Sequence, residues 1–419
     1  MINLSKITDY LLVYLLIAFS GVPFFYRANM LMMLGFLVFP LVVFVVRKRK
    51  IDRFIVYYIL IALVVQIGQM LKFYDLPIAT FLGLHIRLLF AYLTIRAVGN
   101  KTIGYYTNIL CFSVITSLLF YLPSYASGFE PLLKSAVVPF FDNPFIKESN
   151  YVYHPNVILY TINTKGEGLS WLKRNSGPFW EPGAFSGFLI LALIFQIIQT
   201  GTINNTKSKI LILGVVSTFS TSGLMVLVIL LLFYFLLNKK LGYRYFVMPL
   251  LAIGGVVLFF SVDFIGAKVI SKINFTHSTY NTRFKSAWLD INDFIKNPVL
   301  GLGRSEKSRF QAETRGRLIH RNNGVTNHLA MYGGIVFLIY FYLIYLAFYR
   351  MCIAHDVDKR MAFFALVIIM LIGFSQVYFT RVFFIALSMM PVLFNGKKRI
   401  IKSTGSFNPD YVLEHRYEE

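Results

Sequence analysis

The chain has 419 residues, of which 57% are hydrophobic and 14% are charged, and its mean hydropathy is +0.64. So few charged residues cannot cover a folded core with a polar surface, so the composition excludes a soluble globular protein and predicts an integral membrane protein. The formal net charge of +22 then has to be explained by membrane topology or by an anionic partner.

Apolar runs separated by short polar breaks recur along the chain, and most are about as long as a bilayer core of roughly 30 Å requires of a helix. Helices are expected because single strands cannot satisfy their backbone hydrogen bonds in lipid. We therefore predict an all-α polytopic membrane protein, a single membrane domain (1–419), whose first apolar run is a retained helix and not a cleaved signal peptide. Its twelve or so transmembrane helices are expected at residues 10–26, 29–46, 54–72, 77–95, 103–124, 183–199, 209–221, 222–238, 245–262, 326–349, 363–379 and 381–395.

The distribution of lysine and arginine predicts the orientation of these helices. Of the 41 basic residues, 21 fall in the connections and termini of one side, including the run Arg47–Lys50 and the tail 396–419. The positive-inside rule makes that side cytoplasmic, with both termini on it. This explains much of the net charge without a nucleic-acid partner and predicts a multi-pass membrane protein.

Two longer connections, 125–182 and 263–325, are expected outside the cytoplasm, where they would carry the function. Between residues 264 and 326 the chain has eleven basic and four acidic residues. This excess favours an anionic partner such as lipid headgroups, an acidic polysaccharide or a lipid-linked phosphate. No cofactor or metal site is expected, because Cys111 and Cys352 lie far apart without metal-ligand spacing and no phosphate-binding glycine loop is present.

The first outer loop ends in "RNSGPFWEPG", where Pro182 is a favourable first residue for the helix that follows. Glu181 should therefore lie at the positive end of that helix, beside Trp180 and near Arg174. One interpretation is structural, with Glu181 capping the helix and Trp180 in the interfacial aromatic belt. The other is functional, because arginine binds phosphate bidentately and a carboxylate can accept a proton from a sugar hydroxyl.

The second outer loop contains "NTRFKSAWLDINDFIKNPVLGLG", in which apolar residues recur at helical spacing with charged residues opposite them. This predicts an amphipathic interfacial helix that carries Arg283 on its first turn and Trp288 on its apolar face, and that ends at Asn297-Pro298. A polar cluster precedes the tenth helix: His320, Arg321, Asn322 and Asn323. His328, just inside that helix, is expected to be a hydrogen-bonded interfacial histidine. Arg87 lies within the fourth helix, where it either pairs with a neighbouring helix or contributes to the site.

These motifs together resemble the O-antigen polymerase and O-antigen ligase superfamily of bacterial envelope enzymes. The first loop of that family ends in an Arg–Gly–Phe–Glu–Pro pattern, and its second loop contains Arg-x-x-x-x-Trp followed by Asn-Pro-x-x-Gly-x-Gly. The matching residues here are Arg174, Gly177, Phe179, Glu181 and Pro182, then Arg283, Trp288, Asn297, Pro298, Gly301 and Gly303. Ligases typically carry His-Asn about ten residues before a Tyr-Gly pair, where this chain has Asn322-Asn323 before Tyr332-Gly333. That departure favours the polymerase branch.

The resemblance implies a metal-independent glycosyltransferase that joins undecaprenyl-diphosphate-linked oligosaccharides, its donor and acceptor, at the periplasmic face of the bacterial cytoplasmic (inner) membrane. It implies that Arg174 and Arg283 hold the diphosphate, and we expect Arg321 to assist them. Glu181 is the first candidate for the catalytic base and His320 the second. Trp180 and Trp288 are expected to contact glycan or lipid, and Arg87, Asn322 and Asn323 to support the site.

Membrane lipids, and a copolymerase that regulates chain length, are further candidate partners. Two other functions stay open at this point. One is ligation of finished polysaccharide to a lipid A core. The other is a flippase or transporter of the lipid-linked oligosaccharide, which is less favoured because charge collects in two loops and no internal repeat is visible.

Overall fold

The computed structural model describes residues 3–26, 30–141, 155–162, 172–238, 242, 244–261, 283–305, 308 and 321–394. Within these ranges the regular elements are all helices, and the one β-type pair is an isolated bridge between Asn156 and Thr161. The predicted all-α fold class is confirmed. The tail 396–419, His320 and much of the two outer loops lie outside the described residues.

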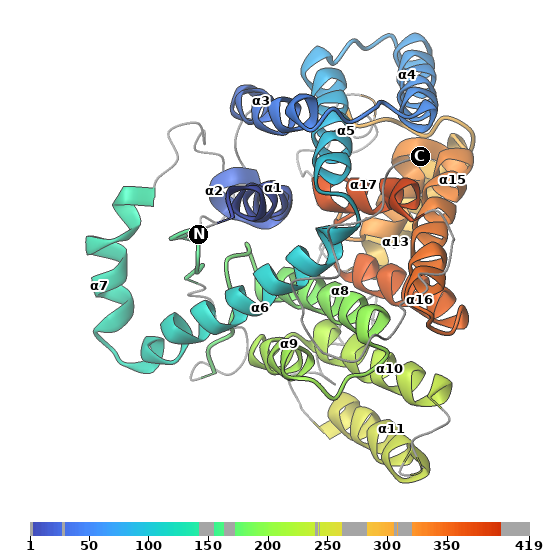
Figure 1. Cartoon of the computed structure of the whole chain (residues 1–419). Helices are drawn as coiled ribbons and strands as arrows, with labels where there is room; N and C mark the ends of the chain where they lie inside the picture. Colours follow the sequence, from blue (N-terminus) through green and yellow to red (C-terminus); the bar gives the residue numbers. More distant parts are fainter. Residues whose placement is uncertain are drawn as a thin grey trace, which may run out of the picture.

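Most of the helices follow one another along the chain with short connections (Figure 1), and longer segments precede α8, α13 and α15. The first group consists of α1 (Leu4–Gly21), α2 (Pro23–Tyr26), α3 (Met30–Val46), α4 (Arg53–Phe73), α5 (Ile78–Val98), η1 (Gly99–Lys101), α6 (Thr102–Tyr121), η2 (Pro123–Tyr125), α7 (Phe129–Ala136) and η3 (Val138–Phe141). The second group consists of α8 (Pro182–Thr200), α9 (Thr206–Ser217), α10 (Thr221–Leu237), α11 (Arg244–Ser261), α13 (Arg283–Lys296), α15 (Gly324–Ala354), α16 (Arg360–Ser375), α17 (Val382–Met389) and η5 (Met390–Leu393).

Each predicted apolar run coincides with one of these helices, although the first run is divided between α1 and α2. Among the described residues, five helical stretches are long and apolar enough to cross a membrane: Leu4–Gly21, Arg53–Phe73, Ile78–Tyr125, Pro182–Thr200 and Gly324–Ala354. Other apolar helices, such as Thr221–Leu237 and Arg360–Ser375, are shorter. Transmembrane character is thus supported, whereas the number of twelve spans stays a prediction.

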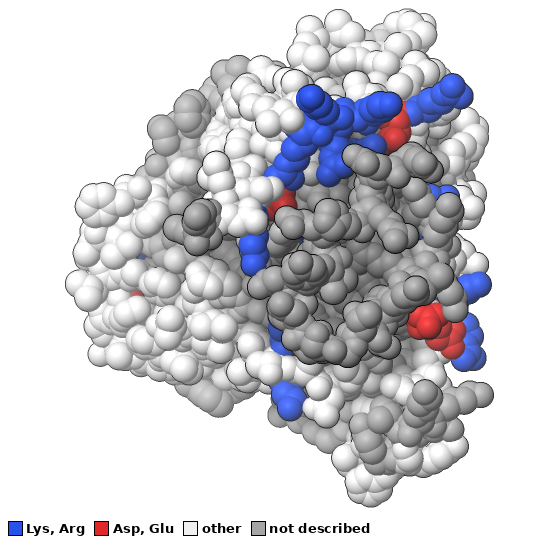
Figure 2. All heavy atoms as spheres, in the orientation of Figure 1, with Lys and Arg blue, Asp and Glu red and all other residues white. Residues whose placement is uncertain are grey.

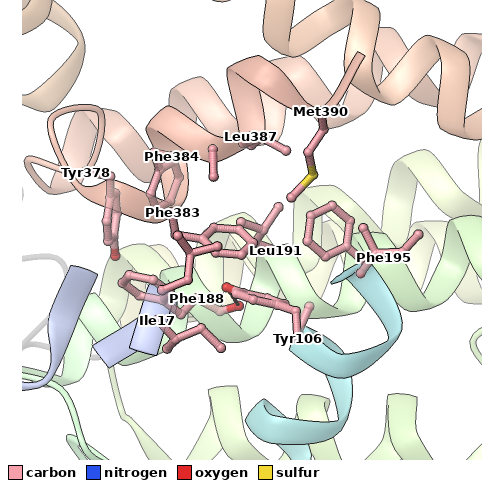
Figure 3. Packing of buried hydrophobic residues seen from close by; sticks show 14 of the residues in the cluster. Ile17, Tyr106, Phe188, Leu191, Phe195, Tyr378, Phe383, Phe384, Leu387 and Met390 are labelled. Carbon is pink, nitrogen blue, oxygen red and sulfur yellow. Dashed lines mark hydrogen bonds between the residues drawn. The ribbon is translucent and has the colours of Figure 1, made fainter. Parts of the chain in front are cut away.

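Helix α8 lies at the centre of the packed core. Its residues from Pro182 to Ile198 are buried, as expected for a helix that is apolar on all faces. Figure 3 shows its side chains Phe188 and Leu191 meeting those of α1, α6 and α17. The Tyr106 hydroxyl donates to the carbonyl of Phe188 at 3.0 Å, and the Tyr106 ring stacks on Phe383 with centroids 4.2 Å apart. These contacts fix the first half of α8 against α6 and α17.

The Asn-Pro-x-x-Gly-x-Gly turn after α13 packs against a kink in α15. The kink is at Gly333, whose φ of 75° and ψ of 173° suit glycine alone. The backbone N–H of Gly303 donates to Met331 at 2.9 Å, and that of Gly334 donates to Pro298 at 2.7 Å. Gly301 also has a positive φ, of 66°. The glycines of the turn and of the Tyr-Gly pair thus let two backbones meet.

Helix α4 lies at the periphery of the bundle (Figure 1) and is joined to this turn through two side chains. The Gln69 amide donates to the carbonyl oxygen of Leu300 and, at 2.9 Å, to that of Met331. The Lys72 ammonium donates to the Asn297 side chain at 2.6 Å. The turn therefore links α4, α13 and α15 at one end of the bundle.

Lysine and arginine side chains gather on the face of the molecule drawn in Figure 2, mainly over the connection between α3 and α4. Two ion pairs lie in this region: Arg47 with Asp9 at 2.5 Å, and Arg96 with Asp52 at 2.9 Å. The connections that the positive-inside rule assigned to the cytoplasm contribute to this basic face.

Candidate functional site

Glu181 is the N-cap residue of α8, as Pro182 predicted. Its backbone is extended, and its carbonyl accepts the N–H groups of Ala184 and Phe185, each at 3.1 Å. Its side chain makes no capping hydrogen bond. The carboxylate instead accepts the side-chain amide of Gln376. Helix capping is therefore not what this carboxylate does.

Gln376 belongs to the connection between α16 and α17, which meets the end of the first outer loop. The Tyr378 hydroxyl donates to the carbonyls of Gly183 and Ala184, at 3.0 and 3.1 Å. The guanidinium carbon of Arg381 lies 4.9 Å from the ring centre of Trp180, a cation–π arrangement. This connection holds the entrance of α8 in place and adds a cation beside it.

Sequence reasoning missed Gln376, Tyr378 and Arg381. The predicted eleventh helix (363–379) and twelfth helix (381–395) leave only one residue between them, so Gln376 and Tyr378 fall inside the eleventh helix and Arg381 begins the twelfth. In the structure α16 ends at Ser375 and α17 begins at Val382. The sequence did contain a signal for this site, since the polar residues Gln376 and Arg381 lie close together between two apolar runs.

The pKa of the Tyr378 hydroxyl depends on three charged groups near it. Burial raises its pKa well above the ordinary value, and the negative charge of Glu181 raises it further, whereas Arg283 and Arg381 lower it. The hydroxyl therefore stays protonated and acts as a donor. One carboxylate and two guanidinium groups, from three separate segments, lie within electrostatic range of this buried group.

Arg283 begins α13, as predicted, and the helix is held against α16 by an edge contact between Phe284 and Phe374, with ring centroids 5.4 Å apart. The apolar side of α13 faces outward, since Trp288 is 63% exposed. Its polar side faces the protein, and Asp290 is completely buried. The predicted glycan or lipid contact, Trp288, therefore lies on an outward-facing helix surface.

Arg174, seven residues before Glu181 in the sequence, contacts the turn between α9 and α10. Its Nε donates to the carbonyl of Thr218 at 3.4 Å. The next residue, Asn175, is fully buried, and its amide donates to Ser117 and Ser217, both at 3.0 Å. In the part of the chain that the structure describes, the carboxylate of Glu181 bonds to Gln376 and forms no ion pair with Arg174.

The polar cluster before α15 fastens the second loop to α13. The Arg321 side chain is 4% exposed and pairs with Asp293 at 3.1 Å and Asp290 at 3.7 Å. The backbone N–H of Asn322 donates to Ser286 at 2.8 Å. Asn323 caps α15 by accepting two backbone N–H groups. These three residues are thus engaged in positioning contacts.

His328 differs from expectation. It is 4% exposed, and among the described residues neither ring nitrogen has a hydrogen-bond partner. Its ring lies 4.5 Å from the Tyr340 ring and 4.9 Å from the Tyr332 ring. The predicted hydrogen-bonded interfacial histidine is wrong, because aromatic rings surround it and α15 continues beyond it.

A cavity of about 220 Å³ lies beside the site, with an almost entirely apolar lining. It is bounded by α4, α5, α15 and the α16–α17 connection, and His328 is one of its lining residues. A smaller cavity of about 30 Å³ shares Gln66 and Tyr332 with it and is lined by Arg304. The predicted supporting residue Arg87 lies on α5 between two residues of the larger cavity, Leu84 and Leu88.

A match to a known protein would give this site a family. Comparisons of the chain with protein-family models, curated proteins and solved structures find no match. The function is therefore argued from the geometry and charge of the site.

Proposed function

We propose that this protein is a membrane glycosyltransferase that polymerises undecaprenyl-diphosphate-linked oligosaccharide repeat units at the outer face of the cytoplasmic membrane. The observation that carries the proposal is the convergence on buried Tyr378 of a carboxylate, Glu181, and two arginines, Arg283 and Arg381. A proton acceptor next to fixed cations suits transfer of a sugar away from a diphosphate.

In the proposed reaction the acceptor hydroxyl attacks the anomeric carbon of the donor sugar. The bond between that carbon and the diphosphate oxygen breaks, and undecaprenyl diphosphate leaves with the electron pair. Glu181 accepts the proton of the attacking hydroxyl. Arg174 and Arg283 stabilise the negative charge that develops on the leaving diphosphate, each through the bidentate geometry of a guanidinium group.

The partner of Glu181 supports its role as base. A carboxylate that serves only to orient an arginine would be expected to pair with it, yet Glu181 accepts a hydrogen bond from a neutral amide, Gln376. The second lone pair of that oxygen and the other carboxylate oxygen can still receive a proton. This arrangement favours Glu181 over a purely orienting role toward Arg174.

The length of α8 supports an outer location for the site. The helix has 19 residues and so spans about 28 Å. Its first residue adjoins the site, and its last leads into the connection to α9, whose first turn carries Lys207 and Lys209, residues that the positive-inside rule assigns to the cytoplasm. The site and that connection are separated by about the thickness of a bilayer core.

The decisive experiment supplies purified protein with undecaprenyl-diphosphate-linked repeat units alone. Longer lipid-linked glycans are expected in gel or mass analysis. If glycan transfer begins only after a lipid A core acceptor is added, the protein is a ligase and the polymerase proposal is wrong. Arg174→Lys and Arg283→Lys, which keep the charge but lose the fork, should reduce turnover, and unchanged turnover would contradict bidentate diphosphate binding.

A further inference from the structure

Three arginines come from separate segments that border the two cavities. Arg87 is on α5 between the lining residues Leu84 and Leu88, and Arg381 directly follows the lining residues Phe379 and Thr380. Arg304 lines the smaller cavity, which shares Gln66 and Tyr332 with the larger one. The positive charges of Arg304 and Arg381 both act on the guanidinium of Arg87.

Within the described ranges, neither Arg87 nor Arg304 forms an ion pair or a side-chain hydrogen bond. The carboxylate of Asp75 also lines the smaller cavity, where it accepts a hydrogen bond from Ser305. One carboxylate beside three guanidinium groups leaves the region with an excess of positive charge. Arg87 lies in the middle of an apolar helix, where an arginine without a counter-ion is costly and marks a binding or transport site. The arrangement calls for an anion with several negative oxygens.

We propose that Arg87, Arg304 and Arg381 form a second phosphate site, which binds the phosphate groups of a polyprenyl-linked substrate whose hydrocarbon chain lies in the apolar cavity. The site rests on the proposed function and deepens it. A polymerase joins two substrates that both carry a lipid diphosphate, so it requires two phosphate sites. Arg174 and Arg283 would serve the donor and this cluster the acceptor.

Position relative to Glu181 supports the assignment to a substrate. Arg381 covers Trp180, which immediately precedes Glu181. Arg174 contacts the carbonyl of Thr218, two residues before Ser220. The hydroxyl of Ser220 and the carboxylate of Glu181 are close together, because each lies within 4 Å of the position that a Cβ atom on Gly183 would take. Arg174 therefore contacts the α9–α10 turn near Glu181, and Arg381 comes to the same helix entrance from the α16–α17 connection.

The test counts bound lipids without any sugar transfer. Full-length protein is placed in nanodiscs of zwitterionic phospholipid and titrated with undecaprenyl diphosphate, and native mass spectrometry measures the number bound. We expect two per chain. Arg87→Met and Arg381→Met should weaken the second binding event about 10- to 100-fold, the loss of one charge-assisted contact, and leave the first unchanged.

Arg360→Met is the matched control, because Arg360 is exposed, pairs with Asp358 at 2.6 Å and does not line the cavity. It should bind two lipids as the wild type does. A single bound diphosphate in the wild-type protein, or Arg87 and Arg381 variants indistinguishable from this control, would overturn the second site. If an equal concentration of phosphatidylglycerol displaces the second lipid, the three arginines bind ordinary lipid headgroups and the proposal is wrong. If inorganic pyrophosphate binds with the same affinity as undecaprenyl diphosphate, the apolar cavity does not bind the prenyl chain.

A second measurement does not depend on how the arginine variants fold. A photoreactive residue replacing Ala62, which lines the cavity, should crosslink to the prenyl chain. One replacing Val46, which is 74% exposed on α3, should crosslink no more than bulk lipid does. Equal crosslinking at both positions would contradict the proposal. Binding of two lipids without polymerisation would support the second phosphate site and reject the proposed polymerase function. Polymerisation with only one bound lipid would support the polymerase function and reject the second site.

Discussion

Gln376 donates its side-chain amide to the carboxylate of Glu181, across a separation of 195 residues. The bond ties the connection between α16 and α17 to the entrance of α8. Because Gln376 is neutral, it orients the carboxylate without adding a positive charge to it. The same connection places Arg381 over Trp180 and Tyr378 against the first turn of α8.

Glu181→Gln should abolish most polymerisation. The amide keeps the size of the side chain and much of its hydrogen bonding but cannot accept a proton, so we expect the rate to fall about 10²- to 10⁴-fold. Binding of undecaprenyl-diphosphate substrate should stay within a few-fold of the wild type. Polymerisation near the wild-type rate would reject Glu181 as the base and leave His320 as the next candidate, to be examined through His320→Gln.

The double variant Glu181→Gln with Gln376→Glu tests whether the position of the carboxylate matters. It preserves the hydrogen-bonded pair and the net charge while moving the carboxylate to the other residue. We expect a folded protein with thermal stability close to the wild type and no recovery of activity. Recovery to the wild-type rate would mean that the local negative charge suffices and that Glu181 is not a positioned base.

Arg321→Met should destabilise the protein rather than merely weaken substrate binding. It removes the partner of two carboxylates, Asp290 and Asp293, one of them fully buried, and stranded buried charge typically costs about 3–5 kcal/mol. Thermal unfolding in detergent measures the loss. Adding Asp290→Asn and Asp293→Asn should restore much of the stability, and activity that returns with it would establish a positioning role. Restored stability without activity would instead favour the contact with the diphosphate that was expected for Arg321 from the sequence.

Gly333→Ala should lower stability strongly. Its backbone conformation suits glycine alone, and an added methyl group would meet the carbonyl of Val299. Strain by itself costs about 1–3 kcal/mol. Gly83→Ala is the matched control, because it lies within α5 with open space around it, and it should be neutral or slightly stabilising. Equal unfolding temperatures for the two variants would contradict the role of the kink in docking the Asn-Pro-x-x-Gly-x-Gly turn.

His328→Phe should retain activity and raise the unfolding temperature. The substitution replaces a buried imidazole without a hydrogen-bond partner among the described residues by an apolar ring that suits its aromatic neighbours. Thermal unfolding and the polymerisation assay measured on the same preparation check both expectations. A large loss of activity with unchanged stability would mean that His328 takes part in the reaction from the cavity wall.

The sequence by itself determined the helical class, the approximate position of each long apolar helix and the place of Glu181 at the start of α8. These features are local: a helix in lipid satisfies its backbone within its own segment, and Pro182 marks a first turn whatever surrounds it. The amphipathic helix that begins at Arg283 was predictable for the same reason, because its side-chain periodicity is a property of the segment alone.

Only the tertiary structure decided which side chains meet. Gln376, Tyr378 and Arg381 join Glu181 and Trp180 through the packing of α8, α16 and α17, and apolar residues that cover these helices on all sides do not specify which faces come together. Asp290 was expected opposite the apolar face of its helix, but only the position of Arg321 explains why it turns inward. Contacts between segments far apart in the chain depend on packing and charge pairing, which local spacing does not encode.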